Sequence, residues 1–194
     1  MKKIEQITVA LAILGVVMKL LLLPGNAAFI GISLPILATI YFPLGFFYFN
    51  SIPIGKIFRK SSYNGISVPR GFGTFGAGLI FSILSTGILF KLLQLPGTGN
   101  MLTIGLTGGI LLFFVILAKY YTNRDSSFYR SMFFRTLIIV GISGILFATP
   151  GLTLVKIFYR DNPEYVKAYE QSANNPDDRE LWIKAEQTRE KTND

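Results

Sequence analysis

The stretch LFKLLQLPGTGNMLTIGL, residues 89–106, carries one lysine, Lys91, in an apolar run that stops at a Pro-Gly pair. Residues 17–34 read VMKLLLLPGNAAFIGISL and place Lys19 at the same distance from a second Pro-Gly pair. Proline cannot continue a helix interior, and glycine adopts backbone angles that other residues resist. Each stretch therefore predicts two apolar helices joined by a tight turn. The predicted turns are Pro24-Gly25 and Pro96-Gly97.

The composition is that of a membrane protein. Of 194 residues, 51% are hydrophobic and only 15% are charged, the mean hydropathy is +0.47, and the apolar residues gather in long runs. A helix needs about 20 apolar residues to cross the hydrocarbon core, whereas barrel strands alternate in polarity over about 10 residues. We therefore expect an all-α polytopic membrane protein with about five transmembrane helices. The predicted spans are residues 4–23, 27–49, 72–95, 100–121 and 131–158, the last kinked at Pro150.

The two lysine-to-Pro-Gly phrases belong to a longer internal repeat. A shift of 72 residues superimposes KLL and LPG and aligns Ile32 with Ile104. The second copy begins after an even number of spans, so both copies are predicted to have one orientation in the membrane. The predicted organisation is a hairpin repeat (1–49), a basic cytoplasmic loop (50–71), a second hairpin repeat (72–121), the fifth helix (131–158) and a soluble helical tail (159–194).

The basic residues predict the orientation. Lys and Arg through Lys156 number 13, against the acids Glu5 and Asp125, and most of these bases flank the links on one side of the predicted spans. Such an excess marks the cytoplasmic side. We therefore expect a multi-pass protein of a bacterial inner membrane, with a cytoplasmic N-terminus and a periplasmic tail. The first span is expected to remain in place rather than be cleaved as a signal peptide.

The sequence lacks the residues that metal binding and proton transfer most often use. It contains no cysteine and no histidine, which removes thiolate ligands and the commonest proton shuttle. Glu5 lies at the boundary of the first span, so no carboxylate is expected at depth to relay protons. We predict no catalytic residues, no metal, no cofactor and no nucleic-acid partner, and hence a protein that is not an enzyme.

Lys19 and Lys91 are the candidate site residues within the spans. Each lies five residues before its proline, about 7.5 Å of helical rise from the helix end. One interpretation is that both side chains extend along apolar surface to the headgroups. The other is that they contact an anionic lipid, the carboxylate of another subunit or the hairpin carbonyls. The expected partners are membrane lipid and other membrane or periplasmic subunits, a second copy of the chain included.

Residues 87–113, GILFKLLQLPGTGNMLTIGLTGGILLF, resemble the two-helix membrane part of the gliding-motility L subunit. In Bacteroidetes that protein is the partner of the M subunit in the proton-driven motor of the type IX secretion and gliding apparatus. The resemblance implies that Lys91 matches a lysine of the family. The family's glutamate, thought to couple proton flow, falls on Gly109 here and on Leu37 in the first copy.

The expected function follows from this departure. A non-enzymatic inner-membrane subunit or accessory protein, related to a motor component, is the first hypothesis. The alternative is a small transporter or channel with an anion-attracting site between the parallel repeats, where Lys19 and Lys91 would act.

The tail carries two helix starts, Asn162-Pro163-Glu164 and Asn175-Pro176-Asp177-Asp178. Asparagine is a favourable cap, proline suits the first helical position, and acids complement the helix dipole. We expect a small hairpin that docks on the membrane or on a partner, unless the tail is a solvated chain. The predicted docking residues are Tyr169, Leu181 and Trp182, with Trp182 as the anchor.

Overall fold

The computed structural model describes residues 2–95, 97–123, 126–175 and 177–190. Within these ranges the secondary structure is helical, with no strand, which confirms the all-α prediction. The helices are α1 (Lys2–Leu20), α2 (Asn26–Tyr41), α3 (Gly45–Phe49), the short 3-10 turns η1 (Ile54–Lys56) and η2 (Lys60–Tyr63), α4 (Val68–Leu92), α5 (Thr98–Thr122), α6 (Ser127–Ala148), α7 (Gly151–Phe158), α8 (Pro163–Asn174) and α9 (Arg179–Glu190).

Three helices, α4, α5 and α6, are long and apolar enough to cross a membrane, and α2 is a shorter apolar helix. They correspond to three of the predicted spans. The predicted span 27–49 is instead divided, because α2 ends at Tyr41 and Phe42 has extended backbone angles (φ −139°, ψ 123°). A residue before proline is disfavoured in the helical region, and Pro43 follows Phe42. The five residues of α3 form a separate turn of helix.

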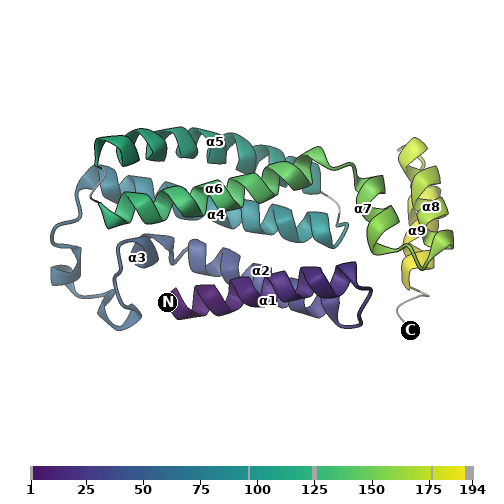
Figure 1. Cartoon of the computed structure of the whole chain (residues 1–194), viewed down its shortest axis with the longest axis horizontal. Helices are drawn as coiled ribbons and strands as arrows, with labels where there is room; N and C mark the ends of the chain where they lie inside the picture. Colours follow the sequence, from purple (N-terminus) through teal and green to yellow (C-terminus); the bar gives the residue numbers. More distant parts are fainter. Residues whose placement is uncertain (1, 96, 124–125, 176, 191–194) are drawn as a thin grey trace.

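The helices form a bundle with two distinct ends (Figure 1). The helix pairs α1–α2 and α4–α5 are antiparallel hairpins, and α4 packs on α2, α5 and α6. One end, here called the turn end, holds both hairpin turns and helices α7–α9 (Figure 1). The opposite end, here called the loop end, holds the start of α1, helix α3 and the link between α5 and α6.

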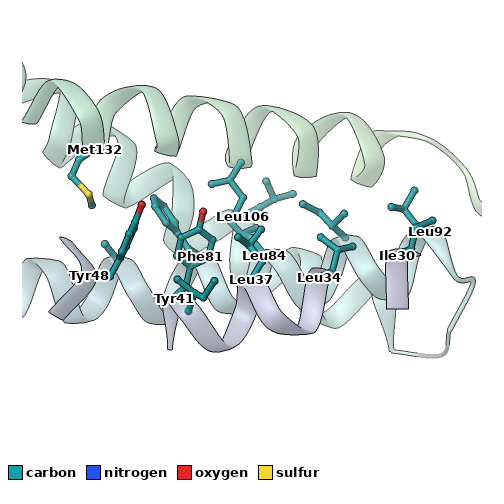
Figure 2. Close-up of a cluster of buried hydrophobic side chains, with 14 of the residues drawn as sticks. Ile30, Leu34, Leu37, Tyr41, Tyr48, Phe81, Leu84, Leu92, Leu106 and Met132 are labelled. Carbon is teal, nitrogen blue, oxygen red and sulfur yellow. The ribbon is translucent and has the colours of Figure 1, made fainter. Parts of the chain in front are cut away.

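A row of apolar side chains fills the middle of the bundle (Figure 2). Ile30 of α2 and Phe81 and Leu84 of α4 are completely buried. Leu34 and Leu37 continue the row along α2, and Leu106 of α5 closes it from above in this view. These large apolar side chains pack against one another and are removed from the surroundings of the bundle, so this row is the packed core.

The described residues of the two hairpin turns have similar φ values and the same hydrogen bonds at the 72-residue shift. Leu22 and Gln94 both have φ 56°, in the left-handed region. The amide of Leu23 donates to Met18 O, and that of Leu95 donates to Phe90 O, each at 2.8 Å. This bonding pattern satisfies the last carbonyls of a helix. Gly25 and Gly97 then start the second helices at φ 81° and 83°, while Pro96 lies outside the described residues.

The predicted fifth helix, residues 131–158 with a kink at Pro150, is instead two separate helices. α6 ends at Ala148, Thr149 and Pro150 are extended, and α7 begins at Gly151. Pro150 lacks the amide hydrogen that a continuing helix would use, which explains the break. In Figure 1, α7 turns away from the axis of α6 and leads into the tail.

The tail folds as the expected hairpin of α8 and α9, which pack on each other. Asn162 Oδ1 accepts from the Tyr165 amide at 3.0 Å, as predicted for a cap. The second helix begins later than expected: Asp178 Oδ1, rather than Asn175, accepts from the amides of Glu180 and Leu181. Pro176 lies outside the described residues.

Candidate functional site

The tail hairpin encloses a cavity of about 600 Å³ at the turn end of the bundle, here called the tail pocket. Residues from the α4–α5 turn form one wall, and α8 and α9 form the other. The charged lining residues are Lys91, Arg189 and Glu186; the aromatic ones are Tyr165, Tyr169, Trp182 and Phe147; Leu95 and Leu102 are the aliphatic side chains of the α4–α5 wall. The pocket therefore combines positive charge, hydroxyl groups and apolar surface.

Lys91 enters the pocket from the last turn of α4. A cation is favourable there because the end of a helix carries a partial negative charge. The nearby Gln94 donates from its side-chain nitrogen to Lys91 O at 2.9 Å, and the Tyr169 hydroxyl donates to Gln94 Oε1 at 3.5 Å. Within the described ranges, Lys91 has no ion pair, so its ammonium group remains available to a ligand.

Arg189 of α9 supplies the second cation. Its guanidinium is paired with Glu186 at 3.0 Å. Arg189 also interacts by charge and by a hydrogen bond with Tyr165, which is buried with 3% of its surface exposed. Burial raises the pKa of Tyr165 to about 12, while the charge and hydrogen bond of Arg189 oppose that increase. Tyr165 is therefore a neutral hydroxyl at physiological pH.

Trp182 and Tyr169 join the two tail helices at the pocket wall. Their rings meet edge to face with centroids 5.5 Å apart, a favourable geometry for aromatic pairs. A Cβ atom at Gly151 would lie 2.7 Å from the Tyr169 hydroxyl, so the absence of a side chain there allows α8 to approach α7. The predicted docking residues Tyr169 and Trp182 thus lie against the protein's own bundle, and Leu181 beside them is half-buried.

Lys19 has different surroundings from Lys91. It lies in the last turn of α1, is 5% exposed, and does not line the pocket. Its Nζ atom is 5.2 Å from the ring centroid of Phe158 and 5.1 Å from that of Tyr159. Arg160 Nη1 donates to Leu20 O at 3.0 Å beside it. The end of α7 therefore covers Lys19, whereas the tail hairpin leaves a cavity beside Lys91.

A second polar cluster lies at the loop end. Glu5 of α1 is buried, with 7% of its surface exposed, and forms an ion pair with Arg135 of α6. The hydroxyls of Tyr41 (2.9 Å) and Tyr48 also donate to the Glu5 carboxylate. The Arg135 guanidinium lies 5.0 Å from the Tyr48 ring centroid. In these four residues, here called the Glu5 cluster, both carboxylate oxygens accept hydrogen bonds.

Glu5 lies near the start of α1, as the sequence indicates, and the structure buries its carboxylate between α1, α2, α3 and α6. Arg135 was expected among the bases near the α5–α6 link and instead points to this carboxylate. The available signal was a single acid in α1 and two arginines but no acid in α6, since ionisable groups in apolar helices usually pair. The separation of Glu5 and Arg135 by 130 residues in sequence concealed the pair.

Comparison with profiles of known families, with characterised protein sequences and with solved structures gave no match for this chain. Its own geometry bears on the resemblance at one position. A Cβ atom at Gly109 would lie 2.9 Å from Val140 Cγ2 and 3.3 Å from Leu84 Cδ1. Gly109 therefore packs closely against α4 and α6.

Proposed function

We propose that the chain is a non-enzymatic inner-membrane subunit that acts by helix packing and by binding at its turn end. In this proposal five helical segments, formed by α1, α2 with α3, α4, α5 and α6, cross the membrane. The N-terminus is cytoplasmic and the tail is periplasmic. The observation that carries the proposal is the packed apolar core between two polar ends.

The core argues for binding rather than transport. A route for a polar solute needs water or polar groups through the middle of the bundle. There the described side chains at full burial include Ile30, Phe81 and Leu84. The buried hydroxyl of Ser85 donates to Phe81 O at 2.8 Å, within its own helix, and so offers no path. Thr136 likewise bonds within its own helix, so these two hydroxyls of the interior form no link between helices.

The matching turns support an origin by duplication. Two hairpins with equal φ values and equal hydrogen bonds at a constant shift are expected from a repeated unit, and both then have one orientation in the membrane. The proposed relation to the motor subunit rests on the resemblance of the second hairpin. With Gly109 enclosed, we propose a relative that does not couple proton flow.

Faces with small residues support assembly with other helices. A Cβ atom at Gly73 or Gly76 of α4, or at Gly141 or Gly144 of α6, would meet no atom within 4 Å. In membranes, small residues allow helices to approach closely. These faces suit a transmembrane helix of another subunit.

Extraction of the tagged full-length chain from its native membrane in a mild detergent tests the proposal. We expect a complex of fixed stoichiometry with another membrane protein. Gly141→Leu combined with Gly144→Leu should dissociate it, whereas Gly31→Leu, at another open glycine on α2, serves as the control. A single species of monomer size in every extraction would contradict the subunit hypothesis.

The tail pocket favours one alternative, an anion transporter. Lys91 and Arg189 would attract an anion to the mouth of such a pathway. The purified chain alone, reconstituted in liposomes, distinguishes the two functions. We expect neither anion uptake nor proton leak; an anion flux that Lys91→Met abolishes would establish the alternative instead.

A further inference from the structure

We propose that the tail pocket binds the phosphate group of an anionic ester, whose carbon skeleton lies against the apolar wall of the same cavity. This inference concerns a ligand rather than a subunit, so it stands or fails separately from the proposed function.

The charges of the pocket favour an anion. Among the described lining residues, Lys91 and Arg189 are cations and Glu186 is the single acid, which leaves one net positive charge. Glu186 is engaged by Arg189 at 3.0 Å, so Lys91 keeps an ammonium group without a carboxylate. An unpaired cation beside apolar surface is costly unless an anion or water accompanies it.

The directions of the donors favour phosphate over carboxylate. Lys91 lines the cavity at the end of α4, and Arg189 of α9 and Tyr165 of α8 line it on the opposite wall. Thr98 and Gly99 add the first turn of α5, where backbone amides have no partner within the helix. A phosphate group offers several acceptor oxygens in a tetrahedral arrangement, whereas a carboxylate offers two in one plane.

The apolar wall implies that the ligand also has a carbon skeleton. Leu95, Leu102 and Phe147 line the cavity, and its volume of about 600 Å³ exceeds what a bare phosphate ion fills. The pocket lies where the long apolar helices α4 and α5 meet the tail. Two sources have this chemistry: the headgroup of an anionic phospholipid, and a soluble phosphate ester.

Trp182, the only tryptophan of the chain, lies in the pocket wall and reports binding without any assay of activity. Its emission would be recorded for the full-length protein in phosphatidylcholine nanodiscs. One arm replaces part of that lipid with phosphatidylglycerol, and the other adds glycerol 3-phosphate to the solution. Succinate serves as the carboxylate probe. Lys91→Met is compared with Lys167→Met, which removes an exposed cation on α8 that does not line the pocket.

We expect a saturable change in emission with at least one phosphate probe, about tenfold weaker in Lys91→Met and unchanged in Lys167→Met. Lys91→Arg, which keeps the charge, should retain part of the binding. Should Lys91→Met not fold, Arg189→Gln provides the same comparison. A response to phosphatidylglycerol alone assigns the lipid source, and a response to glycerol 3-phosphate assigns the soluble one. No response to either phosphate probe, a stronger response to succinate, or equal responses in Lys91→Met and Lys167→Met would overturn the proposal.

Discussion

The two ends of the bundle differ in whether their charged side chains have a partner of opposite charge. At the loop end, the carboxylate of Glu5 is surrounded by donors from Tyr41, Tyr48 and Arg135. At the turn end, Lys91 borders a cavity and forms no ion pair with a described acid, because Glu186 of the same cavity is paired with Arg189. Lys19 lies against two aromatic rings. A charge that is satisfied from within the chain holds helices together, whereas one that is left unsatisfied beside a cavity is available for a ligand.

A carboxylate placed in the middle of the bundle, away from any partner, tests whether the fold accepts the buried Glu5 only because Glu5 is paired. Gly109→Glu should prevent accumulation of folded protein, since it combines an unpaired charge with overlap against Val140 and Leu84, a cost above about 4 kcal/mol. Gly109→Gln is the control, because it makes the same overlap without the charge. Yield of monodisperse protein after detergent extraction measures the difference. Equal yields would mean that the charge at position 109 adds nothing to the cost of the overlap.

Breaking the paired end should have the next largest effect. Glu5→Gln leaves Arg135 without its anion and is expected to lower the free energy of unfolding by about 3 kcal/mol. Glu170→Gln makes the same chemical change in the exposed pair with Lys156, where side chains are 42% and 50% exposed, and should cost less than about 1 kcal/mol. Unfolding of both variants in detergent, followed by circular dichroism, provides the comparison. Similar costs would show that the Glu5 cluster does not stabilise the bundle.

Trp182→Ala should destabilise the α8–α9 hairpin that forms one wall of the tail pocket. Loss of the ring contact with Tyr169 is expected to weaken the α8–α9 hairpin by about 2 kcal/mol, while Trp182→Phe retains most of it. Hydrogen exchange of the tail amides is the measurement, and the exchange of α4 and α5 should stay unchanged. Unaltered protection of the tail in Trp182→Ala would contradict its role as the anchor.

The repeated lysines should respond differently to the same substitution. Lys19→Met removes two cation–π contacts and is expected to cost about 1 kcal/mol of stability. Lys91→Met should change stability by less than about 0.5 kcal/mol and act on binding and assembly instead. Arginine should not fully replace Lys91, since its planar group differs from a compact ammonium. Equal behaviour of the two Met variants in both assays would mean that the different surroundings of the two lysines have no energetic consequence.

At high pH the tail should loosen. The pKa of Tyr165 is raised by burial to about 12, against about 10 for an exposed tyrosine. Between these values the detached hairpin loses the proton while the docked one keeps it, so docking is fully stable below pH 10 and weakens as the pH rises to 12. A red shift of the Trp182 emission over this range, smaller in Tyr165→Phe, is the expected observation. A shift complete below pH 10 would exclude this cause.

Local patterns were sufficient to predict the helices and the turns. Length, hydropathy and the Pro-Gly pairs located α4, α5 and α6, and Asn162 was correctly identified as a cap, whereas Asn175 was not. The break after Tyr41 was missed because apolar residues continue through α3, so only the restriction imposed by Pro43 could have revealed it.

The sites were less predictable than the helices. Lys91 and Trp182 were identified separately, but their meeting in one pocket depends on the direction of α7 after Pro150. The Glu5–Arg135 pair depends on how α6 lies against α1 and α3, which no local pattern encodes.

The contact between α1 and α6 also determines when the protein can be completed during synthesis. Arg135 leaves the ribosome 130 residues after Glu5, an interval on the order of ten seconds at ordinary rates of translation. Throughout that time the first helix has its carboxylate but not the guanidinium that neutralises it. A nascent chain that stalls before α6 therefore carries this carboxylate in an apolar helix without its counter-ion.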